Sequence, residues 1–239
     1  MERFLWVNLI VGIAAVVQSL TGFGLALVAI PFLILVLSPK VAVPMLVGSS
    51  IVLGGALLVE SYRLVDVRRV AYLLIGGILG LPVGTYVLAS FDPHLLKGMI
   101  GGVTLVLAVL LLLGVTRRFH RERRVSVLAG FLSGLIGAST AMYGPPVILF
   151  GLNQAWDKAH FRANLIAYFE GLSLVNMLMF SGFHLVSGPT LLLSVSALPG
   201  MALGFWGGIR LKDRMPERIF RAVAFGLVFA GGISALVGR

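Results

Sequence analysis

Residues 137–146 read Gly-Ala-Ser-Thr-Ala-Met-Tyr-Gly-Pro-Pro and lie inside an uncharged run that extends from residue 125 to residue 156. A straight helix over that run would be about 48 Å long, whereas the hydrocarbon core of a bilayer is about 30 Å thick. The run is therefore too long for one span and too short for two full spans. Because its middle is rich in Gly, Pro, Ser and Thr, the sequence predicts two short helices that meet inside a membrane.

A helix break of this kind has a chemical consequence. Backbone N–H groups at the break are tolerated within a membrane only where protein or a cavity satisfies them. A helix that begins there points the positive end of its dipole at whatever occupies the cavity. We interpret residues 137–146 as one half of an anion-binding site.

The composition excludes a soluble domain. The chain has 239 residues, of which 59% are hydrophobic and only 12% are charged, and its mean hydropathy is +1.03. These values predict an all-α polytopic membrane protein. The net charge of +10 lies in short loops between apolar runs, which is typical of topology signals, so nucleic acid is not an expected partner. The chain has no cysteine, and neither a metal nor a cofactor is expected.

Eight apolar runs divide the chain, and they indicate an internal repeat. The runs fall at residues 4–37, 41–61, 70–91, 95–115, 125–153, 160–182, 188–209 and 219–237. The first run is as overlong as the fifth and contains its own break candidate at residues 18–24. Gly80-x-x-x-Gly84 matches Gly200-x-x-x-Gly204 about 120 residues later. We predict two repeats, 1–118 and 119–239, each a broken or re-entrant helical hairpin (4–37 and 125–153) followed by three transmembrane helices.

The basic loops predict how the two repeats are oriented. Loops 62–69, 116–124 and 210–217 are rich in arginine, and the positive-inside rule assigns them to the cytoplasm. Their repeat equivalents at 183–189 and 91–94 carry neither lysine nor arginine. The repeats are therefore predicted to be inverted, with both chain termini outside. Inverted repeats with broken helices are typical of secondary transporters. We also expect kinks at Pro82 and Pro199, which lie inside predicted spans.

The candidate substrate-binding residues are small, hydroxyl-bearing or amide-bearing residues at the two breaks and in the spans that follow them. They are Gln18, Thr21, Gly22, Phe23, Gly24, Ser49, Ser50, Ser139, Thr140, Tyr143, Gly144, Pro145 and Asn164. The alternative for each glycine is close helix packing, and the alternative for each serine is a hydrogen bond to its own helix.

Two acidic residues are treated separately. Glu170 lies near the middle of the run 160–182, and an ionisable group at that depth is a functional hypothesis, here a coupling site. The alternative is a protonated carboxyl group that bonds to a neighbour. For Glu60 we expect a solvated ion pair with Arg63 at the cytoplasmic end of its span.

Several of these motifs resemble one known family. Gln18-x-x-Thr21-Gly22-x-Gly24 followed by Pro31, then Gly144-Pro145-Pro146 and Phe161-Arg162-Ala163, look like the TauE/SafE sulfite exporter family over nearly the whole chain. The resemblance implies a carrier of sulfite or organosulfonates in a prokaryotic plasma (inner) membrane. Many members have a glycine-rich second signature, whereas this chain has side chains over residues 139–143 that narrow or re-line the cavity.

The expected function is therefore a secondary transporter, an exporter of small sulfur-containing anions that works by alternating access at a midplane site between the two hairpins. A passive anion channel is the main alternative. An intramembrane serine hydrolase using Ser139 is a weaker one, because such a nucleophile needs a nearby base and the histidines fall in loops or at span ends: His94, His120, His160 and His184. No enzyme activity is expected. The expected partners are the anion and the lipid bilayer, and a homodimer is left open.

Overall fold

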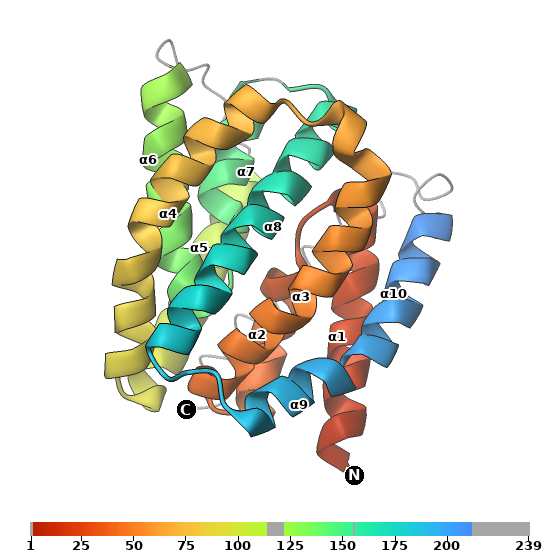
Figure 1. Cartoon of the computed structure of the whole chain (residues 1–239), viewed down its shortest axis with the longest axis vertical. Helices are drawn as coiled ribbons and strands as arrows, with labels where there is room; N and C mark the ends of the chain where they lie inside the picture. Colours follow the sequence, from red (N-terminus) through yellow and green to blue (C-terminus); the bar gives the residue numbers. More distant parts are fainter. Residues whose placement is uncertain (1, 114–121, 155, 212–239) are drawn as a thin grey trace.

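The computed structural model describes residues 2–113, 122–154 and 156–211, and within these ranges the chain is helical and contains no β-strand (Figure 1). The all-α class predicted from composition is confirmed. The predicted span 219–237 lies outside the described residues. The helices are α1 (Glu2–Thr21), α2 (Leu25–Val36), α3 (Pro39–Ser61), the short 3₁₀ helix η1 (Tyr62–Leu64), α4 (Val67–Ser90), α5 (Pro93–Leu113), α6 (Glu122–Thr140), α7 (Gly144–Asn153), α8 (Lys158–Gly182), α9 (Gly188–Ser196) and α10 (Leu198–Leu211).

Both overlong runs are interrupted, but their two helices are unequal in length. Helix α1 has 20 residues and α2 has 12, while α6 has 19 residues and α7 has 10. At 1.5 Å per residue, the first helix of each hairpin is about 30 Å long and the second is about 15 to 18 Å long. The prediction of two short helices was therefore wrong for α6. The two helices differ in length because α6 begins at Glu122, before the uncharged run, and α7 ends at Asn153, before the run ends.

The two hairpins open toward opposite ends of the helix bundle. In Figure 1, α1 starts at the end marked N, and the chain returns to that end through α2 before α3 begins. Helix α6 starts at the opposite end, and α7 returns to it before α8 begins. This is the relation that an inverted repeat requires, although the division of the chain into two repeats stays a prediction.

The helices of the two predicted repeats interlock. Helix α4 packs along α6, α10 packs along α1, and α3 packs along α8. The matched glycine pairs make two of these contacts. A Cβ atom at Gly80 or Gly84 would overlap backbone oxygens of α6, and one at Gly200 or Gly204 would overlap backbone oxygens of α1. The absence of side chains thus lets the paired backbones touch, as in other membrane helix interfaces.

The predicted span 188–209 is divided into α9 and α10 at Ala197. Pro199 lacks the N–H group that would continue the helical bonding across this point, which explains the interruption. Asn8 of α1 closes the gap: its Nδ2 donates to the Ser196 carbonyl oxygen at 2.8 Å, and its Oδ1 accepts from the Gly200 N–H at 2.9 Å. Pro82, in contrast, lies inside the uninterrupted helix α4.

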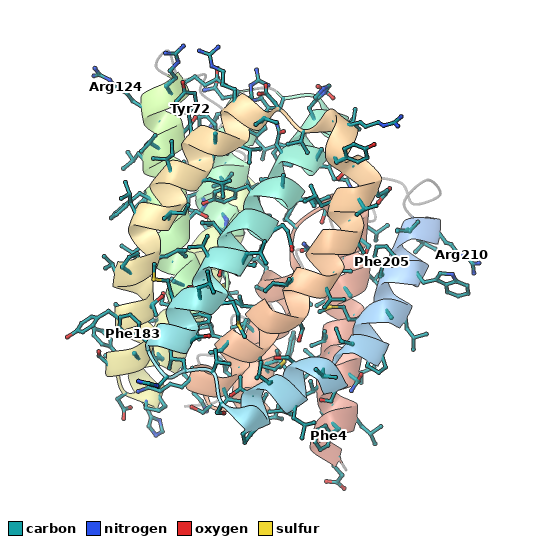
Figure 2. All side chains as sticks on the ribbon, in the orientation of Figure 1. Phe4, Tyr72, Arg124, Phe183, Phe205 and Arg210 are labelled. Atoms are coloured by element: carbon teal, nitrogen blue, oxygen red, sulfur yellow. The ribbon has the colours of Figure 1, made fainter. Side chains whose placement is uncertain are left out.

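Five of the described helical segments are long and apolar enough to cross a membrane, and the outer surface carries large exposed apolar side chains such as Leu79, Leu178 and Leu203. In Figure 2, Phe4 and Phe183 lie toward one end of the bundle, while Tyr72 and Arg124 lie at the other. Arginines cluster in an open cleft at that second end, which is lined by Arg68, Arg69, Arg123 and Arg124. The chain is a multi-pass membrane protein.

Candidate functional site

The two helix breaks have the same local geometry. At the first break Gly22 has a left-handed backbone (φ 83°), and at the second Ala141 does (φ 61°). Each of these residues donates its N–H to the carbonyl oxygen four residues earlier, at 2.7 Å for Gly22 and 2.6 Å for Ala141. Each follows a threonine, Thr21 or Thr140, whose hydroxyl oxygen accepts the amide N–H two residues later at 3.2 Å. The threonine therefore ends the first helix of the hairpin and turns the chain.

Gln18 joins the two helices of the first hairpin. Its Oε1 accepts the backbone N–H of Leu25, the first residue of α2, at 3.1 Å. The side chain is 8% exposed. No hydrogen bond from its Nε2 is found to any residue that the structure describes.

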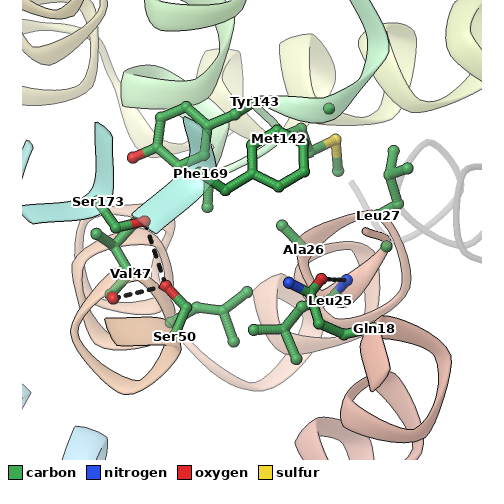
Figure 3. Close-up of a pocket in the computed structure, with 14 residues that line it drawn as sticks. Gln18, Leu25, Ala26, Leu27, Val47, Ser50, Met142, Tyr143, Phe169 and Ser173 are labelled. Atoms are coloured by element: carbon green, nitrogen blue, oxygen red, sulfur yellow. Dashed lines mark hydrogen bonds between the residues drawn. The ribbon is translucent and has the colours of Figure 1, made fainter. Parts of the chain in front are cut away.

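A cavity of about 50 Å³ lies between the two breaks. It is large enough for a few water molecules or for one ion of four or five heavy atoms. Figure 3 shows Ser50 and Ser173 on one side, Gln18 and Leu25 on the other, and Tyr143, Phe169 and Met142 across from them. Four parts of the chain supply its lining: Gln18, Gly24, Leu25, Ala26 and Leu27 from the first hairpin, Leu46, Val47 and Ser50 from α3, Ala141, Met142, Tyr143 and Gly144 from the second break, and Phe169 and Ser173 from α8.

The first break offers more backbone donors to this cavity than the second. The N–H groups of Ala26 and Leu27 lie in the first turn of α2, where a helix has no internal acceptor for them, and no hydrogen bond from either is found within the described ranges. At the start of α7 the corresponding donors are missing, because Pro145 and Pro146 have no N–H. Two residues of the cavity lining, Ala26 and Leu27, thus have amide N–H groups for which no acceptor is found in the described ranges, and no lining residue carries a formal charge.

Hydroxyl groups line the opposite side of the cavity. Ser50 donates to the Val47 carbonyl oxygen at 2.8 Å, and its hydroxyl lies 3.5 Å from that of Ser173. The phenol oxygen of Tyr143 accepts from Asn176 Nδ2 at 2.6 Å. Asn176 Oδ1 in turn accepts from the hydroxyl of Thr85 at 3.3 Å. These hydrogen bonds orient Tyr143 at the cavity. They also give partners to two buried polar groups, the amide of Asn176 and the hydroxyl of Thr85.

The structure brings some of the predicted site residues together and leaves others outside the cavity lining. Those in the lining are Gln18, Gly24, Ser50, Tyr143 and Gly144. Those outside it are Thr21, Gly22, Phe23, Ser49, Ser139, Thr140, Pro145, Asn164 and Glu170.

The residues outside the lining have other contacts. Ser49 donates to the carbonyl oxygens of Met45 and Ser194 at 2.9 and 3.1 Å. Ser139 and Thr140 donate to the Ile136 carbonyl oxygen at 2.9 and 2.7 Å, so both hydroxyls bond to their own helix. Asn164 accepts the backbone N–H of Asp66 at 2.7 Å and ties α8 to the start of α4. Phe23 packs edge-on against Phe161, with 6.5 Å between the ring centroids.

Arg162 is a contact of the first break that the sequence did not indicate. Its Nη2 donates to the Ser19 carbonyl oxygen at 3.2 Å and to Glu60 at 3.0 Å. A Cβ atom at Gly22 would lie only 2.8 Å from Arg162 Cγ. The arginine therefore caps the end of α1, where carbonyl groups lack helical partners. The expected pair of Glu60 with Arg63 was wrong, because Glu60 faces α8 and Arg63 Nε donates to the Tyr62 hydroxyl instead.

Glu170 lies on α8 against α3, outside the cavity lining. It is 8% exposed. Its Oε2 occupies the space where a Cβ atom of Gly54 would stand, and its Oε1 lies 3.9 Å from such an atom at Gly55. Neither oxygen has a hydrogen bond or an ion pair with any residue that the structure describes.

One comparison with known proteins identifies a family for the chain. The family model described as "Sulfite exporter TauE/SafE" matches residues 7–235. No curated protein and no solved structure matches the chain. The family match covers both hairpins and the cavity between them, and it extends over nearly all of the 239 residues. The chain therefore belongs to the sulfite exporter TauE/SafE family, a family of membrane transporters for sulfur-containing anions.

Proposed function

We propose that the cavity between the two breaks is the binding site of a secondary transporter that exports a small sulfur-containing anion by alternating access. The observation that carries the proposal is that residues of both hairpins line one cavity, from Gln18 to Leu27 on the first and from Ala141 to Gly144 on the second. The hairpins open toward opposite ends of the bundle, so a relative movement of the two halves would expose the cavity to one side at a time.

The donors around the cavity support an anionic substrate. The N–H groups of Ala26 and Leu27 stand at the positive end of the α2 dipole, and Gln18 Nε2 adds a side-chain donor. Because these donors are neutral, they bind an oxyanion through hydrogen bonds without the strong Coulomb attraction that a buried lysine or arginine would add. A carrier must bind its anion weakly enough to release it on the other side of the membrane.

The size of the cavity supports a small substrate. About 50 Å³ accommodates a few water-sized groups, which favours a small ion such as sulfite. Longer organosulfonates such as sulfoacetate would need Phe169 or Met142 to move aside. We therefore rank sulfite above sulfoacetate and taurine as the substrate.

Two other functions have less support from the structure. A passive anion channel would use the same donors, but a cavity lined by two broken hairpins that open toward opposite ends of the bundle favours a carrier. A serine hydrolase requires a base beside its nucleophile. Ser139 donates to Ile136, and the histidines in the described part of the chain, His94, His160 and His184, lie at helix ends.

The proposal is tested with purified protein by isothermal calorimetry over sulfite, sulfoacetate, taurine and sulfate, followed by flux measurements in proteoliposomes. We expect sulfite to bind best, its flux to saturate, and sulfite on the far side of the membrane to accelerate exchange. Flux that rises linearly with concentration and ignores sulfite on the far side would support the channel instead. Absence of binding by every sulfur-containing anion would refute the proposed function.

A further inference from the structure

Glu170 is a buried acid that the proposed anion site does not use. It is 8% exposed, and its carboxylate is pressed against the glycine pair Gly54 and Gly55 of α3. Helices α3 and α8 lie side by side through the centre of the bundle (Figure 1). Because Gly54 and Gly55 have no side chains, the surface of α3 has space for the Glu170 carboxylate.

No described residue neutralises this carboxylate. Helix α8 packs against α3, α4, α7 and η1. Helix α7 has no ionisable side chain. Apart from Glu170 and Lys158, the ionisable side chains on the other elements are Lys40 and Glu60 on α3, Tyr62 and Arg63 on η1, Arg68, Arg69, Tyr72 and Tyr86 on α4, and His160, Arg162 and Tyr168 on α8. Lys40 donates to the Ala89 carbonyl oxygen, Arg162 pairs with Glu60, and Tyr168 donates to Gly130. Among the bonds found in the described ranges, none reaches Glu170.

An unpaired carboxylate inside a membrane protein is costly while it is ionised, because it has lost water and gained no partner. Protonation removes that cost. Binding of a proton to Glu170 therefore changes the charge at the contact between the two central helices, α3 and α8.

Glu170 is also close to the proposed anion site. Ser173 lines the cavity and follows Glu170 by one helical turn on the same face of α8. Ser50, which lies 3.5 Å from Ser173, precedes Gly54 by one turn on α3. A negative charge on Glu170 thus opposes an anion in the cavity, while a protonated Glu170 does not.

We infer that Glu170 is the proton-binding site of the carrier and that a proton is taken up when the anion binds. The step is a simple protonation: the carboxylate of Glu170 accepts one proton from water, and no other bond forms or breaks. Because anion and proton favour each other's binding, the two ions move in the same direction. This inference rests on the proposed function of the cavity.

The test is the number of protons taken up per sulfite bound, measured by calorimetry in two buffers of different ionisation enthalpy. Wild type and Glu170→Gln are compared at the same pH, so that the proton exchange of sulfite itself cancels in the difference. We expect wild type to take up as much as one proton more than the variant. We also expect the sulfite affinity of wild type to fall about tenfold more than that of the variant as the pH rises from about 6 to about 8. Equal proton numbers in the two proteins would overturn the inference and leave the anion site standing.

A second pair of variants covers the case in which Glu170→Gln does not fold. Gly54→Ala retains the acid but displaces its carboxylate, because the new Cβ would overlap Oε2. Gly55→Ala is the matched control, since its Cβ would lie at an ordinary contact distance of 3.9 Å from Oε1. We expect Gly54→Ala to change the proton uptake and Gly55→Ala to leave it as in wild type. An unchanged uptake in both variants would contradict the role given to this contact.

Infrared spectroscopy of the ligand-free protein separates this inference from the proposed function. We expect the stretching band of a protonated carboxyl group to appear as the pH is lowered, and we expect this band to be absent in Glu170→Gln and shifted in Gly54→Ala. If no sulfur-containing anion binds wild type but the band is present, the proposed function fails while the proton site stands. If the band is missing in wild type at every pH tested, the proton site is refuted whatever the anion does.

Discussion

At the scale of single residues, Gln18 has two tasks in one side chain. Its oxygen caps α2 by accepting the Leu25 N–H, and its nitrogen, in a residue that lines the cavity, has no hydrogen bond to the described part of the chain. The first task stabilises the hairpin, since a capping bond satisfies an amide that has no helical partner. The second task, binding the substrate, is part of the proposed function and can be tested by substitution.

Gln18→Glu retains an oxygen for the Leu25 amide but replaces the nitrogen donor by a second oxygen. Because a hydrogen bond to a charged ligand contributes about 1.5 to 3 kcal/mol, we expect sulfite affinity to fall by about 10-fold to 100-fold in calorimetry. The thermal midpoint should fall as well, because a carboxylate at this buried position is costly while it is ionised. Ser49→Ala is the control, because that hydroxyl is bonded to Met45 and Ser194 outside the cavity lining. Wild-type affinity in Gln18→Glu would exclude Gln18 from the site.

Ala141 is strained in a way that Gly22, its counterpart at the first break, is not. A non-glycine residue in the left-handed region costs roughly 1 to 2 kcal/mol, part of which is offset because glycine loses more entropy on folding. We predict that Ala141→Gly stabilises the protein by up to about 1 kcal/mol and raises its thermal midpoint in detergent. Ala167→Gly, inside helix α8, should instead lower the midpoint. A lower midpoint for Ala141→Gly would mean that the turn is not held in this conformation.

At the scale of helices, glycine decides which pairs can touch. Gly204 of α10 faces the backbone of α1, while a Cβ atom at Gly207 on the same helix would have no atom of the described residues within 4 Å. We predict that Gly204→Ala destabilises the protein by about 1 to 3 kcal/mol, because α10 must move away from α1. Gly207→Ala should be neutral or slightly stabilising. Thermal unfolding of the two variants in detergent measures the difference, and equal midpoints would contradict the packing of these helices.

The sequence was informative about where helices break and poor about which way they face. The breaks near Gly22 and Ala141 could be predicted because an uncharged run longer than the membrane must be interrupted where Gly, Ser, Thr and Pro accumulate. The contacts of Arg162 and Asn8 could not. These helices are apolar over most of their circumference, so their periodicity does not indicate which side faces a neighbour.

The same reason explains the mixed outcome for the candidate site. Gln18 and Tyr143 lie at the cavity, whereas the hydroxyls of Ser139 and Thr140, in the same short stretch as Tyr143, bond back to α6. Whether a hydroxyl faces a cavity or its own helix depends on helix rotation and on packing partners far away in the sequence.

At the scale of the whole molecule, charge predicts the orientation in the membrane. Arg68 and Arg69 line one cleft with Arg123 and Arg124, and the positive-inside rule predicts that this end of the bundle is cytoplasmic. The chain has no cysteine of its own, so single cysteines report side-specific access without background. We predict that Arg63→Cys reacts with an impermeant thiol reagent only from the cytoplasm and Ser181→Cys only from outside. Labelling of both from one side would contradict the inverted arrangement.

The central claim is that two hairpins from opposite ends of the bundle bind one anion between their tips. Hydrogen–deuterium exchange of the purified protein, followed by mass spectrometry with and without sulfite, tests this most directly. The account predicts that sulfite slows amide exchange at residues 24–27 and at residues 141–144, with the same dependence on sulfite concentration at both tips. Sulfite binding that protects one tip, or neither, would contradict it.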